Sequence, residues 1–129
     1  VEALLVVADQ REEINAFAAT GRTPQEQEAF DFVQKLGNYR KSQAALHNGK
    51  MMQFAPENGL YAVARYTQDR LILTVVNASD QPATVSMERF DELLNKKRDA
   101  IRALDRTPVR LTERWEAGAW SSEIFEFQR

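Results

Sequence analysis

The spacing of hydrophobic residues changes from helical to strand-like near residue 49. Over residues 23–47, polar positions alternate with apolar side chains that recur three or four residues apart, namely Ala29, Phe32, Val33 and Leu36. This spacing is typical of an amphipathic helix. Thr23, Pro24 and Glu26 match the start of a capped helix. We expect the helix to end at His47–Gly49, closed by asparagine or glycine in the left-handed conformation.

After residue 49, short apolar runs are separated by turn-forming residues, which is typical of an antiparallel sheet. The segment Arg70–Val76 is almost wholly apolar, which predicts a central strand with Leu71, Leu73 and Val75 facing the core and with Ile72 and Val76 covered on the other face. We interpret Phe90–Leu104 as a helix. The other expected strands cover residues 51–54, 60–66, 83–87, 109–111 and 122–127. The pattern therefore predicts an α+β fold, with an N-terminal helix packed on a small antiparallel β-sheet or β-sandwich.

The composition is that of one globular domain without a strongly charged surface. The 129 residues include 17 basic and 19 acidic side chains, for a formal net charge of −2. Nucleic-acid-binding domains usually carry a basic stripe. Here acidic residues flank the run Lys96–Arg98, so we interpret it as a solvated helix face. The most apolar stretch, Ala3–Ala8, is too short to cross a bilayer and lacks the basic start of a signal peptide. We therefore expect neither nucleic acid nor a membrane as a partner.

Residues that usually carry chemistry are scarce in this chain. It has no cysteine and a single histidine, His47, so thiolate metal sites and histidine-based catalytic arrangements lack their components. No glycine-rich phosphate-binding motif occurs. Glu57, Asp69 and Asp80 lie in hydrophilic turns, whereas glycoside hydrolysis needs two facing carboxyl groups, one with a raised pKa. We predict no catalytic residue, no cofactor-binding residue and no metal ligand in this chain.

Four aromatic side chains are candidates for contact with a ligand. Tyr61 and Tyr66 lie on opposite sides of an expected strand, and Trp115 and Trp120 flank an expected turn. Aromatic residues on strands commonly belong to the core, but exposed rings can also stack on sugar rings. Both interpretations stay open, and coplanar exposed rings on one face would favour sugar contact.

Several motifs occur in the order and spacing of a known family. They are Asn15–Phe17, Gly21–Pro24, Glu28–Leu36, Asn38–Lys41, Ala45–Lys50, Phe54–Asn58, Leu71–Asn77 and, more faintly, Ala119–Phe127. Together they resemble the last barrel helix and the C-terminal antiparallel β-sandwich of the alpha-amylase superfamily, most of all its neopullulanase and cyclomaltodextrinase branch. The resemblance is good over about residues 14–90 and weaker over 92–113, and residues 1–13 depart from the family pattern.

This resemblance implies a division of the chain after residue 48. Residues 1–48 would comprise an N-terminal segment and the final helix of a catalytic barrel, and residues 49–129 a C-terminal antiparallel β domain. The family's nucleophile, general acid and supporting aspartate lie upstream on barrel strands and have no counterpart here, and a closed barrel needs about 250 residues. The resemblance therefore implies a non-catalytic accessory or structural domain of an α-glucan hydrolase, whose barrel lies upstream in the same polypeptide.

Such a parent enzyme would cleave α-1,4-glucosidic bonds of maltooligosaccharides, cyclodextrins or pullulan. An extracytoplasmic or periplasmic location of the parent is compatible with the absence of cysteine from this chain. Two alternatives stay open: a carbohydrate-binding module with its own glucan affinity, and a protein-interaction domain unrelated to amylases. Because the aromatic residues are few, we expect weak or no binding to soluble α-glucans. We also expect the helix to dock through Phe32, Val33 and Leu36, and the apolar surface left without a barrel to favour a homodimer.

Overall fold

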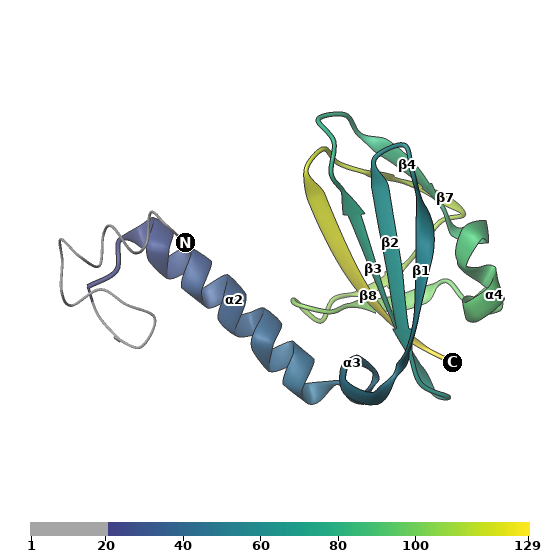
Figure 1. The fold of residues 1–129 in the computed structure, drawn as a ribbon, viewed down its shortest axis with the longest axis horizontal. Coiled ribbons are helices and arrows are strands. Elements are labelled where there is room, and N and C mark those ends of the chain that lie inside the picture. Colours follow the sequence, from purple (N-terminus) through teal and green to yellow (C-terminus); the bar gives the residue numbers. More distant parts are fainter. Residues whose placement is uncertain (1–20) are drawn as a thin grey trace. The chain divides into compact units, whose positions relative to one another are not determined.

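The computed structural model describes residues 21–129, so the Ala3–Ala8 run and the Asn15–Phe17 motif lie outside the described residues. The chain divides into two compact units, residues 1–38 and residues 39–129. The long helix α2 (Pro24–Ser42) contributes its last turn to the second unit, which also holds the short helix α3 (Ala44–Asn48) and all the strands that the structure describes. Helix and antiparallel sheets together make an α+β fold, as predicted (Figure 1).

Helix α2 begins where the sequence predicts. The Thr23 hydroxyl accepts a hydrogen bond from the Glu26 backbone N–H at 3.2 Å, and the Thr23 carbonyl accepts one from Gln27 at 2.9 Å. Thr23 is therefore the N-cap residue. The helix is interrupted earlier than expected, because Gln43 is extended, with φ −112° and ψ 108°.

Gly49 ends α3 for a different reason from the one that the sequence suggested. Its φ is −71°, which is not the left-handed conformation, so the predicted form of closure is wrong. A Cβ at this position would lie 2.2 Å from the Ala45 carbonyl oxygen and 2.9 Å from the Tyr66 carbonyl oxygen. The glycine is needed because two backbone segments approach each other too closely for a side chain.

Six antiparallel strands form the main sheet, in the order β1-β2-β3-β8-β5-β6, and two more strands, β4 and β7, form a second sheet. Figure 1 labels β1, β2, β3 and β8 of the main sheet and both strands of the second. A 3₁₀ turn, η1 (Met87–Phe90), and a single helical turn, α4 (Asp91–Leu94), follow β4. Asn58 and Gly59 both have positive φ, 52° and 80°, in the tight turn between β1 and β2. The strand bounds are β1 Lys50–Glu57, β2 Leu60–Tyr66, β3 Arg70–Asn77, β4 Ala83–Ser86, β5 Asp99–Arg102, β6 Pro108–Arg110, β7 Arg114–Ala117 and β8 Ser121–Gln128.

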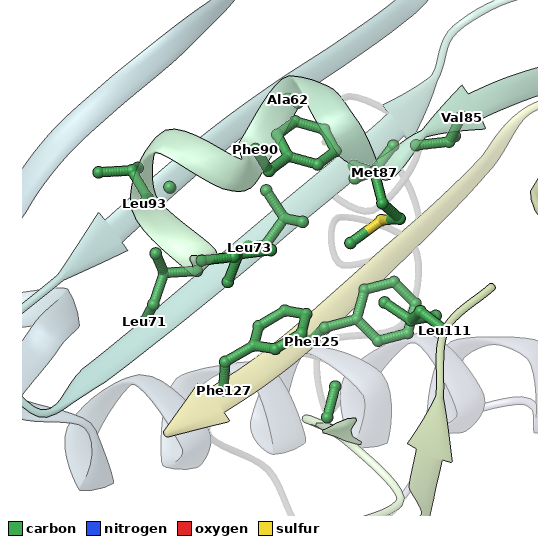
Figure 2. Close-up of a cluster of buried hydrophobic side chains, with 14 of the residues drawn as sticks. Ala62, Leu71, Leu73, Val85, Met87, Phe90, Leu93, Leu111, Phe125 and Phe127 are labelled. Atoms are coloured by element: carbon green, nitrogen blue, oxygen red, sulfur yellow. The ribbon is translucent and has the colours of Figure 1, made fainter. Parts of the chain in front are cut away.

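The main core lies on one face of the six-stranded sheet. Strand β3 pairs with β2 on one side and with β8 on the other, so the predicted central strand is confirmed. Met87 and Phe90 from η1 cover Leu73 on β3 and Phe125 on β8 (Figure 2). The core buries Leu71, Leu73, Val75, Val85, Met87, Phe90, Leu94, Phe125 and Phe127, among others.

A second, smaller cluster lies on the opposite face of the same sheet. Ile72, which is 1% exposed, packs there with Tyr39 from the last turn of α2 and with Ala45 from α3. The end of the helical region thus packs on the sheet, and the prediction that Ile72 is covered on the other face is confirmed, whereas Val76 on that face is only partly buried. Within the described residues, Phe32 and Val33 are 50% and 65% exposed. The docking of the earlier turns of α2 stays a prediction.

The helix predicted over Phe90–Leu104 is wrong. Helix α4 ends after one turn because Asn95 and Lys96 take left-handed φ values of 49° and 61°. The chain then forms β5, turns back and forms β6, which pairs with β5. The helical spacing of apolar residues is therefore coincidental: Phe90, Leu93 and Leu94 lie in the main core, whereas Leu104 packs against the smaller cluster on the other face of the sheet.

Candidate functional site

The two candidate tyrosines do not form a common surface. Tyr61 is 53% exposed on β2, whereas Tyr66 packs against the main core. They lie five positions apart on one strand, an odd number, so their side chains point to opposite faces of the sheet. The guanidinium of Arg129 lies 4.8 Å from the centre of the Tyr66 ring. The structure therefore does not bring the two rings together.

The two candidate tryptophans are also in different surroundings. Trp115 on β7 packs edge-to-face with Phe125, with ring centres 5.5 Å apart, and its indole N–H donates to the sulfur of Met87 at 3.2 Å. Trp120 is 72% exposed and has a left-handed φ of 51°. The Trp120 backbone N–H donates to the Ser79 carbonyl at 3.0 Å, which holds this turn in place. Trp115 is thus part core and part surface, while Trp120 is presented to solvent.

A buried carboxylate that the sequence did not predict lies on the face of the sheet that carries the smaller cluster. The Glu126 side chain on β8 is 2% exposed and accepts hydrogen bonds from the Tyr39 hydroxyl at 3.0 Å, from Arg106 at 2.7 Å and from Arg70. The three donors come from the end of α2, from the turn after β5 and from β3. This arrangement fixes the last turn of α2 to the sheet. The only sequence signal was Glu126 itself, an acidic residue inside an apolar strand.

The surroundings of Glu126 favour its ionised form. Burial by itself raises the pKa of a carboxyl group, but the hydrogen bonds from Arg106 and Tyr39 and the charges of Arg106 and Arg70 outweigh it and lower the pKa of Glu126 below its usual value. Burial and the neighbouring Glu126 charge in turn raise the pKa of Tyr39. The carboxylate therefore stays charged and the phenol stays neutral at neutral pH.

We expect Glu126→Gln to reduce stability at pH 7 by about 2 kcal/mol, because the charge-assisted bonds are lost while two of the partners are partly solvated. The pKa of Glu126 is lowered in the folded state, so its contribution is present above the unfolded pKa and is lost as pH falls through the folded pKa. The difference between the two proteins should thus shrink below about pH 4.5. Urea unfolding at pH 7 and at pH 3.5 measures it. Glu92→Gln, at an exposed position, is the control; an equal difference at both pH values would contradict the assignment.

A second ion cluster corrects the interpretation of Lys96–Arg98 as a solvated helix face. The Arg98 side chain is 6% exposed, and its guanidinium donates to both carboxylate oxygens of Asp91 (2.7 and 3.1 Å) and of Glu113 (2.9 and 3.1 Å). Lys96 and Lys97 are exposed. Arg98 is therefore a structural tie between α4 and the start of β7, because buried charges need such partners.

Asn77 is a third buried polar residue, and it joins the two sheets. Its side-chain amide donates to the carbonyl groups of Gln81, Ala117 and Gly118 at 2.8, 3.2 and 3.0 Å, while its oxygen accepts from the Ser79 backbone N–H at 3.2 Å. These bonds tie the end of β3 to the end of β7, just before the Trp120 turn.

The other candidates for chemistry have ordinary structural surroundings. The His47 Nε2 atom lies 2.7 Å from the Arg40 carbonyl at the end of α2. Glu57 is 3.6 Å from Arg89, and Asp69 accepts a hydrogen bond from Thr67 at 2.9 Å. Over residues 21–129, no group of three or more acidic or histidine side chains could hold a metal ion. No helix in the described part of the chain has the length and apolar character to span a membrane.

Comparison with known proteins gives the family. The model of the cyclo-malto-dextrinase C-terminal domain matches residues 51–126, which is more than half of the chain and includes all eight strands in whole or part. This match removes the alternative of an interaction domain unrelated to amylases.

Similar solved structures include an Anoxybacillus alpha-amylase, at 20% identity and a TM-score of 0.64 over 77% of this chain and 22% of that one. The E221Q variant of AmyP in complex with maltotriose has 10% identity and a TM-score of 0.69 over 85% of this chain and 22% of its own. The trehalulose synthase MutB of Pseudomonas mesoacidophila MX-45 has 22% identity and a TM-score of 0.60 over 75% of this chain and 17% of its own. At these identities the likeness concerns the fold, and this chain spans about a fifth of those proteins. The match to the family model, together with this likeness of fold, shows that this chain belongs to the cyclo-malto-dextrinase C-terminal domain family of the alpha-amylase superfamily.

Proposed function

We propose that this chain is a non-catalytic accessory domain of an α-glucan hydrolase, joined to an upstream catalytic barrel in the same polypeptide. In this proposal residues 49–129 form the C-terminal β domain and residues 1–48 include the last helix of the barrel. The parent would cleave α-1,4-glucosidic bonds of maltooligosaccharides, cyclodextrins or pullulan. The observation that carries the proposal is the family match over residues 51–126.

The state of the buried carboxylate supports a non-catalytic role. A general acid needs a raised pKa to hold its proton at neutral pH. Glu126 has a lowered pKa and three donors on its two oxygens. It therefore has the properties of a structural acceptor.

Two features of α2 support a barrel as its partner. Phe32 and Val33 are large apolar side chains that remain exposed among the described residues. Gly37 lies inside the helix, where glycine costs about 1 kcal/mol relative to alanine, and a Cβ there would meet no described atom within 4 Å. Close approach of a barrel helix would account for both. In the isolated chain, the same surface favours the homodimer, which light scattering over a concentration series would detect.

We expect no hydrolysis of maltooligosaccharides by this chain alone, because the paired carboxyl groups of the reaction are missing. The purified chain is incubated with maltoheptaose, cyclodextrin and pullulan, and reducing ends are measured over hours. Release of reducing sugar at a rate proportional to chain concentration, and retained through a second purification step, would contradict the proposal. Loss of such turnover in Glu126→Gln, with folding verified by circular dichroism, would make Glu126 catalytic and would contradict its role as a structural acceptor.

A further inference from the structure

A cleft opens at the side of the main core, between β7 and the strands β5, β6 and β8. Its volume is about 320 Å³, and its wall includes Trp115, Arg102, Glu123, Glu116, Thr112 and Ser121. The cleft belongs entirely to the second unit. Small-molecule sites typically begin at about this size, and they combine an apolar wall with a few polar groups.

Trp115 supplies the apolar wall. Its indole N–H is already bonded to the sulfur of Met87, and Phe125 packs against it edge-to-face. These contacts hold the indole in one orientation, so little conformational entropy is lost when a ligand contacts its remaining surface. The aliphatic C–H face of a sugar ring is the complement of such an aromatic surface.

Arg102 and Glu123 supply the polar groups. One nitrogen of Arg102 lies 3.3 Å from both carboxylate oxygens of Glu123, and the two side chains are 41% and 34% exposed. A guanidinium has five N–H donors and a carboxylate has about four acceptor positions. This contact uses one guanidinium nitrogen, so donors on Arg102 and acceptor positions on Glu123 remain for a ligand, and both residues line the cleft. Neighbouring hydroxyl groups of a sugar each donate and accept, so they match such a pair.

The charges of the cleft favour a neutral ligand. In the cleft wall, Arg102 is paired with Glu123, and Arg110 is paired with Asp99, which lies outside the wall. Both guanidinium groups therefore already have a carboxylate partner, and an anionic ligand would have to compete with it. We propose that this cleft binds a single glucose unit of an α-glucan, through the face of Trp115 and the Arg102–Glu123 pair. The choice of an α-glucan among neutral sugars rests on the proposed function. The charges and side chains of the cleft favour a neutral sugar independently of that function.

A single-tryptophan variant tests this site directly. The chain has two tryptophans, so Trp120→Asn leaves Trp115 as the one fluorescent indole. Asparagine suits the left-handed φ of 51° at this position. We expect maltotriose to change the fluorescence of this variant saturably, with a dissociation constant on the order of millimolar, because about one sugar ring is contacted. Cellotriose, titrated in parallel, should change it less.

Two further variants test whether the fluorescence change depends on the Arg102–Glu123 pair. Arg102→Met keeps the aliphatic contact and removes the donors, and Glu123→Gln removes the charge while nearly preserving shape. In the Trp120→Asn background, each should weaken maltotriose binding at least fivefold, with thermal unfolding checked for each. Glu92→Gln, at an exposed position away from the cleft wall, should leave it unchanged.

Three outcomes would overturn the proposal. They are the absence of saturation by either sugar in the folded Trp120→Asn chain, saturation by cellotriose alone, and maltotriose binding that the unmodified chain shows by calorimetry but that Trp120→Asn loses. The last would move the contact to the exposed indole of Trp120. None of these outcomes bears on whether the chain lacks hydrolytic activity, so failure here is distinguishable from failure of the proposed function.

Discussion

Val75→Asp should abolish cooperative folding of the β domain. Val75 is 2% exposed at the centre of β3, between β2 and β8, and its side chain lies in the main core. The substitution removes a buried valine and places a carboxylate where nothing pairs with it, at a cost of roughly 5 kcal/mol or more. Domains of this size have only about 5–15 kcal/mol of stability in total. Thermal unfolding followed by circular dichroism measures the effect.

A matched substitution separates burial from strand propensity in this experiment. Gln53 is exposed on strand β1, so Gln53→Asp introduces the same carboxylate on a strand without burying it. We expect the control to melt cooperatively, with a stability change within about 1 kcal/mol. A cooperative transition for Val75→Asp near that of the control would show that β3 is not the buried centre of the sheet.

Arg98→Ala should destabilise the domain by about 3 kcal/mol, because it leaves Asp91 without its charge partner and opens a space beneath α4. The Arg98 side chain is 6% exposed, and those of Asp91 and Glu113 are 21% and 72% exposed. The penalty therefore comes mainly from Asp91 and from lost packing, while Glu113 returns to solvent. Urea unfolding at pH 7 measures the change.

The chain offers an exposed ion pair as the control for Arg98. Arg110 lies 2.8 Å from Asp99, with side chains 74% and 80% exposed. Exposed pairs contribute about 0–1 kcal/mol, so Arg110→Ala should have little effect on stability. Equal effects of the two substitutions would show that Arg98 is not the buried tie between α4 and β7.

The strands were predictable because their signals are local. The apolar run Arg70–Val76 and the turn at Asn58–Gly59 define two neighbouring strands by burial and by backbone conformation, and both features act over a few residues. The N-cap at Thr23 is local in the same way. These elements lie where the sequence places them.

The segment after Phe90 was not predictable, because its structure depends on distant partners. Arg98 resembles a surface residue in the sequence, yet Glu113, fifteen positions later, helps to bury it. The left-handed residues Asn95 and Lys96 end α4. Asparagine favours this conformation, but no glycine or proline accompanies it, so the local signal is weak beside the helical spacing of the apolar residues. The helical spacing of the apolar residues therefore favoured one long helix, where the structure has a single helical turn followed by a strand.

The interacting polar side chains were not predictable either, because their partners lie far apart in the sequence. Glu126 meets Tyr39 from 87 positions away, and Arg102 meets Glu123 from 21 positions away. Both pairs depend on the order of strands in the sheet, which alternation of apolar residues does not specify. The four aromatic candidates were visible in the sequence, and alternation over residues 60–66 already placed Tyr61 and Tyr66 on opposite sides of the strand. Which side faces the core depends on the rest of the sheet.

The contact between Tyr39 and Glu126 has a consequence for protein engineering. A chimera that joins this β domain to another barrel at residue 49, where the apolar pattern changes, would leave Ile72 and the Glu126 carboxylate without the side chain that covers them. A junction on the N-terminal side of Tyr39 keeps this covering side chain in the transferred domain. The practical boundary for exchanging modules between relatives therefore lies inside α2, about ten residues before the first strand.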